Sequence, residues 1–256
     1  MARRKFLFAL LWLLPMPLAA QISDPIVTEQ TLEKLPFNTT MDNEPHHHLV
    51  LKNDIVKVFK VDLPPRDAFV KHEHDHDYIS IVIVGATTVS TVSGQADILT
   101  ISKNGDVHFV RLGTLHSVRN IGQTAYRAVS IELLRTQTGA RNLCGKQIAD
   151  VKPDCPTAAA EDAKAPSIDM PQFETDQARV TLTRILPHQS ATFVEPSRDE
   201  LIVSIDETAV AAGSGKGGDK PQHPGDFMWI RHGDAARIVR NNSEKEARIV
   251  RVEFKP

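Results

Sequence analysis

The 256 residues contain 30 Lys and Arg against 32 Asp and Glu, which gives a formal net charge of -2. Because the basic residues are scattered along the chain rather than grouped, the composition argues against a nucleic-acid partner. Only 5% of the residues are aromatic, and Val, Ile and Thr dominate the patterned segments. Both features favour β-strands over a helical core.

The N-terminal residues 1–20 have the layout of a cleaved secretory signal: a basic start, an apolar middle and small residues at Ala19 and Ala20. The apolar run is short and is interrupted by two prolines, so an uncleaved membrane anchor is the weaker interpretation. The sequence therefore predicts an exported protein, periplasmic or secreted, that is free of the membrane once the signal is removed.

The most unusual stretch is KHEHDHDYISIVIVG, residues 71–85. Taken literally, His72, Glu73 and His76 match the H-E-x-x-H pattern of zinc proteases, whose chemistry requires a helix. Here, however, the segment follows Leu-Pro-Pro and runs into a succession of Ile and Val that is typical of a strand. On a strand, side chains two residues apart share a face, so His72 and His74 can present two imidazoles to one point.

Two stretches of the chain recur in order. GDVHFVRLG at 105–113 matches GDFMWIRHG at 225–233, and LPPRDAFVKHEHDHDYISIVI at 63–83 aligns without gaps to residues 185–205. The offsets are 120 and 122 residues, which indicates a duplicated module. Within each module, short alternating segments are separated by turn signals, and this predicts paired β-sandwiches or barrels.

The segment between the modules, residues 138–168, is rich in Pro and Ala and is predicted to be a linker. It holds the two cysteines of the chain, Cys144 and Cys155. In an exported protein their short separation predicts a disulfide, which would stabilise the fold by about 3 kcal/mol on the loop-entropy model. A pair of metal thiolates is the alternative, although no Cys-x-x-Cys spacing supports it.

Together the motifs resemble those of the cupin superfamily, specifically its two-domain bicupins. The first motif of the family is G-x5-H-x-H-x(3,4)-E-x6-G. His72, His74 and Gly85 match it, while Arg66 stands in place of the first Gly and Tyr78 in place of the Glu. The second motif is G-x5-P-x-G-x2-H-x3-N. Gly105, Gly113, His116 and Asn120 match it, and Arg111 stands at the Pro position.

The resemblance implies an all-β fold of two tandem jelly-roll barrels, with an N-terminal cupin domain at 21–137 and a degenerate one at 169–256. It also implies that His72, His74 and His116 hold one divalent metal ion. Three imidazoles suit Fe, Zn, Cu, Ni or Mn, so the ligands alone do not select the metal. Tyr78 or His76 is the candidate to replace the missing Glu ligand, and a polar barrel mouth without metal is the alternative.

The second module lacks the paired histidines, because Val194 and Pro196 stand at their positions and Ala236 or Arg237 at that of His116. We expect a structural role for this half. Elsewhere, the His46–His48 cluster is expected at a solvated strand entrance. His108 alternates with apolar neighbours and is expected on an outer face.

Two classes of function follow from the resemblance. One is an exported three-histidine, metal-dependent oxygenase that acts on a small molecule; the other is a non-catalytic cupin that binds a small ligand or a metal. Assembly into a homo-oligomer is compatible with either. Fold does not choose between them, since cupins carry many functions, and no feature of the sequence identifies the substrate.

Overall fold

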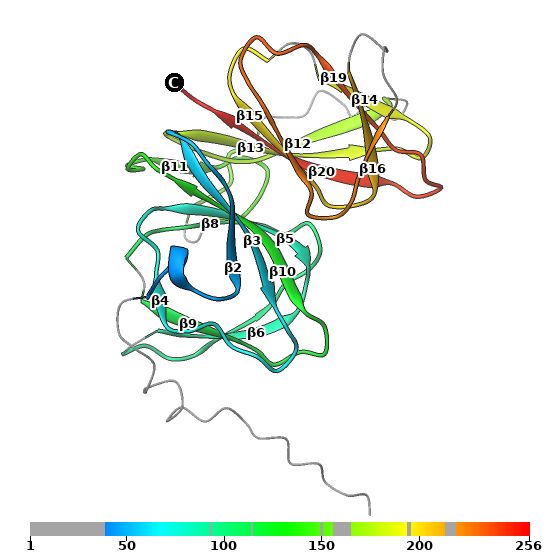
Figure 1. The fold of residues 1–256 in the computed structure, drawn as a ribbon. Coiled ribbons are helices and arrows are strands. Elements are labelled where there is room, and N and C mark those ends of the chain that lie inside the picture. Colours follow the sequence, from blue (N-terminus) through cyan, green and yellow to red (C-terminus); the bar gives the residue numbers. More distant parts are fainter. Residues whose placement is uncertain are drawn as a thin grey trace, which may run out of the picture. The chain divides into compact units, whose positions relative to one another are not determined.

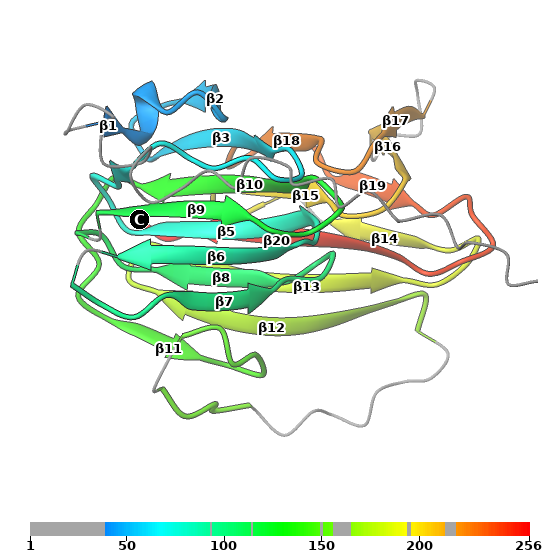
Figure 2. The same cartoon turned by 90° about the horizontal axis from the view of Figure 1, so that it is seen from below.

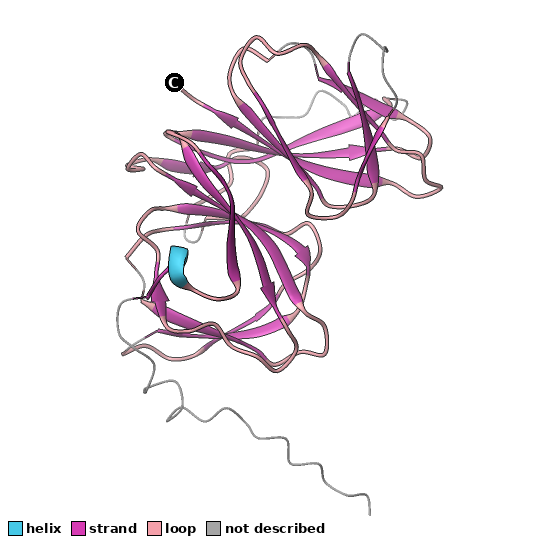
Figure 3. Cartoon of the chain, viewed as in Figure 1, coloured by secondary structure: helices cyan, strands magenta, loops and turns pink. Residues whose placement is uncertain are grey.

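The computed structural model describes residues 39–92, 94–113, 115–148, 151–155, 165–193, 196–212 and 219–256. Within these ranges the chain forms twenty β-strands and one 3-10 turn, η1 (Met41–Asn43). Figure 3 shows that strands make up almost all of the regular structure. The all-β prediction is confirmed. In the described ranges, no helix has the length and apolar character needed to cross a bilayer. The predicted signal segment 1–20 lies outside them.

The first barrel consists of two five-stranded sheets. The first runs in the order β1 (Thr39–Thr40), β4 (His72–Glu73), β9 (His116–Asn120), β6 (Thr87–Val92), β7 (Ile98–Ile101). The second runs in the order β2 (His47–Lys52), β3 (Val56–Leu63), β10 (Tyr126–Leu133), β5 (Tyr78–Val84), β8 (Val107–Val110). Except for the parallel pair β1 and β4, the paired strands are antiparallel.

The second barrel repeats this plan (Figure 1). Its six-stranded sheet runs β11 (Ala140–Asn142), β12 (Ser167–Thr175), β13 (Ala178–Ile185), β20 (Ala247–Phe254), β15 (Glu200–Ser204), β18 (Phe227–Ile230). Its four-stranded sheet runs β14 (Ser190–Phe193), β19 (Arg237–Arg240), β16 (Thr208–Ala212), β17 (Lys220–Gln222). The tandem jelly-roll prediction is confirmed. The 138–168 segment contributes β11, which pairs with β12.

The largest hydrophobic core lies between the barrels. It joins the outer faces of β3, β5, β8 and β10 to those of β12, β13, β15 and β20, and its members include Ile81, Ile131, Val203 and Val252. Strands buried on both faces carry apolar runs rather than strict alternation, which accounts for Ile79–Ile83. The two barrels belong to one compact unit that runs to Pro256, and Figure 2 shows their strands stacked in layers.

The duplication extends to individual backbone angles and hydrogen bonds. Gly105 and Gly225 open the two GD repeats with φ of 86° and 85°, a region that glycine enters without a steric penalty. Asp77 and Asp199 each accept a hydrogen bond of 2.8 Å from a backbone amide just beyond the matching β8 or β18 strand. The residues that recur in the sequence therefore form the same turns in both modules.

The predicted disulfide is present. Cys144 and Cys155 are bonded, with their Cα atoms 4.3 Å apart. Just before the loop that they close, the buried Asn142 donates to two carbonyls within it, those of Ile148 and Val151, at 2.9 and 2.6 Å. Disulfide and amide thus fix the chain as it leaves the first barrel.

Arg66 and His188, which are equivalent in the duplication, are the two described non-glycine residues with a left-handed backbone, at φ of 68° and 56°. Arg66 is the residue that replaces the first Gly of the cupin motif. A side chain in this region costs roughly 1–2 kcal/mol.

We therefore expect Arg66→Gly to be more stable than Arg66→Ala by about 1 kcal/mol, because both variants lose the side chain and only Gly relieves the backbone. Urea denaturation of the two variants measures the difference. An alanine variant as stable as the glycine variant would contradict the backbone account.

Candidate metal centre

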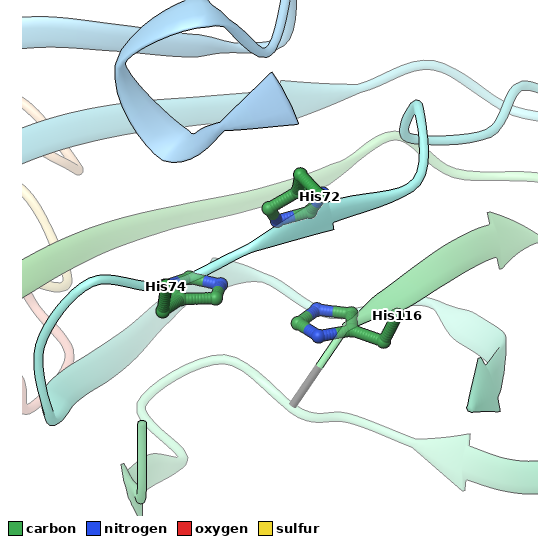
Figure 4. Close-up of side chains that lie close together, drawn as sticks. All are labelled: His72, His74 and His116. Atoms are coloured by element: carbon green, nitrogen blue, oxygen red, sulfur yellow. The ribbon is translucent and has the colours of Figure 1, made fainter. Parts of the chain in front are cut away.

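Strand pairing brings the three motif histidines together. His72 lies directly opposite His116 in the antiparallel pair β4 and β9, and His74 follows two residues along on the same side. One ring nitrogen from each lies within 4.8 Å of the others. The ring centroids are 4.7 to 5.3 Å apart, and Figure 4 shows the three imidazoles gathered around one point.

His72 is oriented by the backbone. Its Nδ1 lies 2.8 Å from the carbonyl oxygen of Val70, which requires Nδ1 to carry the proton and leaves a lone pair on Nε2. That Nε2 atom is buried and has no hydrogen-bond partner among the described residues. Burial, followed by the neighbouring His116 and His47, lowers the pKa of His72 to about 4. The ring is therefore a neutral ligand at neutral pH.

His74 is held by stacking. Its ring lies parallel to that of Tyr78, with centroids 3.9 Å apart, and parallel to that of His116 at 5.3 Å. Burial, followed by His116 and His72, lowers its pKa to about 2. Three buried imidazoles around one point, two of which (His72 and His74) have a buried ring nitrogen without a hydrogen-bond partner among the described residues, form a donor set that fits a divalent transition metal.

The two candidates for a fourth ligand occupy different places. Tyr78 stacks on His74 and forms a wall of the site, and burial raises the pKa of its hydroxyl above the usual value. His76 lies outside the three-histidine cluster, with its Nδ1 3.7 Å from the carboxylate of Glu132. A ligand role for either residue stays a prediction.

Glu132 is a functional candidate that the sequence analysis missed. It lies on β10 with a side chain only 1% exposed, and its Oε1 is 4.0 Å from Nδ1 of His74. Lys57 Nζ lies 3.7 Å from its other oxygen. Burial raises its pKa to about 7, against the opposing effect of Lys57. Carboxylates behind ligating histidines fix ring orientation in metal sites. The sequence feature that could have pointed to Glu132 is its position as the single acid in the apolar run AVSIELL, residues 128–134.

The expectation of a solvated His46–His48 cluster is wrong for His47. This residue is 8% exposed, its ring centroid lies 5.0 Å from that of His72, and its Nδ1 is 2.5 Å from Oε2 of the buried Glu44. Glu44 also accepts hydrogen bonds from the backbone amides of His46 and Val70. It therefore ties the start of β2 to the loop before β4.

The cluster opens onto a cavity of about 520 Å³ inside the first barrel. The expectation that His108 faces outward is also wrong, because it lines this cavity. Apart from the three cluster histidines and Tyr78, the lining comprises His47, Val61, Phe69, Ser80, Thr88, Ser90, Ile98, Thr100, Ser102, His108, Phe109, Val110, Val118, Tyr126, Ser130 and Gln147.

The second barrel holds an ion pair at the matching place. Glu200, the counterpart of Tyr78, accepts a hydrogen bond of 2.6 Å from Arg251, whose guanidinium lies 4.6 Å from the ring centroid of Phe193. Asp169 lies 3.2 Å from the same guanidinium. Val194 lies outside the described residues. Among those that are described, the first-barrel histidines form the only cluster able to share an ion.

Neither models of known protein families nor the curated proteins gave a match to this chain. Solved structures did match. A variant of salicylate 1,2-dioxygenase from Pseudoaminobacter salicylatoxidans, in complex with gentisate, is 12% identical with a TM-score of 0.56, over 88% of this chain and 77% of that one.

A cupin 2 conserved barrel domain protein from Leptotrichia buccalis is 10% identical with a TM-score of 0.53, over 82% of this chain and 88% of that one. AerE from Microcystis aeruginosa is 9% identical with a TM-score of 0.54, over 83% and 99%. These likenesses and the paired jelly rolls define the chain as a protein of the two-barrel cupin fold.

Glu132 makes a testable contribution to the pH dependence of stability. In the folded protein it keeps its proton up to pH about 7, whereas the unfolded chain releases it near 4.5. Between these values the folded state binds more protons than the unfolded state, so the wild-type protein loses stability as pH rises.

Relative to Glu132→Gln, which cannot ionise, we expect metal-free wild-type protein to lose up to about 3 kcal/mol of unfolding free energy between pH 4.5 and 7. The contributions of titratable groups that do not lie beside Glu132 cancel in this difference. Urea titrations of both proteins across the range measure it, and a difference independent of pH would contradict the buried, protonated carboxyl.

Proposed function

We propose that this protein is an exported, three-histidine, metal-dependent oxygenase that acts on a small molecule in the first-barrel cavity. The observation that carries the proposal is the convergence of three buried imidazoles on one point at the wall of a cavity inside the first barrel. The likeness to a dioxygenase crystallised with gentisate supports a small-molecule ligand.

The ligand set determines what the chain contributes. His72, His74 and His116 supply three nitrogen donors and no negative charge, so a bound divalent ion keeps its full positive charge and has coordination positions left for a ligand. Such an ion would supply Lewis-acid or redox activation. Tyr78 and Phe69 pack against the histidines and limit the access of water to that point.

Export is supported by two features. The first is the signal-like N-terminus, and the second is the disulfide between Cys144 and Cys155, a bond that persists in oxidising compartments. The proposal accordingly includes a location in the periplasm or outside the cell.

The second candidate is a non-catalytic cupin that binds a ligand or a metal. One observation favours it: the described cavity lining contains no carboxylate that could serve as a general base beside the cluster. Oxygen consumption by the Fe(II)-loaded protein, measured with a panel of small phenols and alcohols, separates the two functions. Tight binding without oxygen uptake would favour the binder.

The metal assignment predicts close to one divalent ion per chain. His74→Ala and His116→Ala should lose it, because two imidazoles remain in each variant. Glu73→Ala should keep it, because Glu73 is exposed and one residue out of phase with the ligands. Elemental analysis of tag-free protein after reconstitution with Fe, Zn, Cu, Ni or Mn checks the stoichiometry.

Glu73→Ala is also the control that separates the strand site from the zinc-protease interpretation, in which Glu73 would be essential and His74 would not. Full metal occupancy of His116→Ala would overturn the site. Two tightly held ions would contradict the assignment of the second barrel as structural.

A further inference from the structure

The cavity that the histidines face has an uncharged wall. Of its twenty described lining residues, none is Asp, Glu, Lys or Arg. Ligand sites commonly orient an anionic ligand with an arginine or lysine, and no described residue of this wall offers such a group. Arg119, on β9, does not line the cavity. It directly follows the lining residue Val118 and is therefore one residue out of phase with the inward-facing side chains of this strand.

The wall is instead rich in hydroxyl groups. Ser80 on β5 lies opposite Ser130 on β10, and Ser80 Oγ is 3.4 Å from the hydroxyl of Tyr126. On β6, Thr88 and Ser90 are two residues apart and both face inward, while the intervening Val89 does not line the cavity. Further hydroxyls come from Tyr78, Thr100 and Ser102.

His47 adds no net positive charge to this wall. Its Nδ1 is 2.5 Å from the carboxylate of Glu44, so a proton carried by the ring is balanced by that buried acid. Glu44 engages Nδ1 of the ring, so Nε2 is the nitrogen that His47, a lining residue, can turn to a ligand. It can therefore pair with a hydroxyl of a ligand.

We propose that the cavity wall away from the three histidines selects the uncharged, hydroxyl-bearing part of a small molecule and disfavours carboxylates there, a substrate class that deepens the proposed oxygenase function and rests on the same site. The physical reason is desolvation. A hydroxyl that enters the cavity exchanges water for wall hydroxyls, whereas a carboxylate loses its hydration and meets no cation of the chain. The cavity volume of about 520 Å³ suits a ligand of one or two rings.

Salicyl alcohol and salicylate are a matched pair of probes, because they differ only in CH2OH against a carboxylate. Calorimetric titration of metal-free protein reports on the walls alone, and circular dichroism verifies that this form is folded. We expect salicyl alcohol to bind at least about tenfold more tightly, equivalent to about 1.4 kcal/mol. Equal or tighter binding of salicylate would overturn the proposal, as would the failure of salicyl alcohol to bind at millimolar concentrations.

Ser90→Arg places a guanidinium in the wall and should reverse the preference, raising the affinity for salicylate about tenfold or more. Thr91→Arg is the matched control, because Thr91 is the next residue on β6 and does not line the cavity; it should leave both affinities unchanged. If Ser90→Arg fails to fold, Thr100→Lys on the edge strand β7 makes the same test. An equal response of the lining and control variants would overturn the proposal.

Metal content and oxygen uptake, measured on the same protein, keep this inference separate from the proposed function. If the protein binds one ion yet prefers salicylate in the metal-free form, the wall inference fails while the metal site stands. If it shows the alcohol preference but binds no ion or consumes no oxygen with any substrate, the proposed function fails while the wall inference stands.

Discussion

The face-to-face packing of the two central sheets is the contact on which the rest of the structure depends. Ordinarily a β-barrel is stabilised by apolar side chains that fill its interior. Here the first barrel places a large share of its apolar side chains on the outside, against the second barrel. Its interior can therefore hold a hollow, hydroxyl-lined space and three buried imidazoles. A polar interior is tolerable because the apolar surface buried between the barrels replaces the stabilisation that an apolar interior would have contributed.

The second barrel completes this division of roles. Its interior is packed with apolar residues such as Phe193, Ile202 and Ile249, and the place equivalent to the three-histidine cluster of the first barrel holds the Arg251–Glu200 ion pair. The guanidinium belongs to the chain and supplies a permanent cation, so the site needs no exogenous ion to balance the buried carboxylate. One module has kept an open cavity, and the other supplies the surface that supports it.

Much of this was predictable from the sequence. A period of two placed His72 and His74 on one face, and repeated GD turns revealed the duplication. His116 entered only through the cupin motif, because its position opposite His72 depends on pairing between strands 44 residues apart. His108 was misplaced because β8 is buried on both faces: Val107 and Phe109 pack between the barrels, so alternation could not tell the cavity from solvent. Glu132 and His47 are functional candidates only through contacts that no local pattern encodes.

The repeat has a consequence for how the interface arose. Residues at matching positions of the two modules both belong to it, for example Ile79 and Leu201, Ile131 and Val252, and Val58 and Val180. An interface built from the same patch on both sides is the hallmark of a two-fold symmetric dimer. The chain is thus a dimer of like barrels joined covalently, and tethering makes their association intramolecular. Dilution into a large volume would separate a dimer of free barrels but leaves this pair together, a property that the export proposed above would call for.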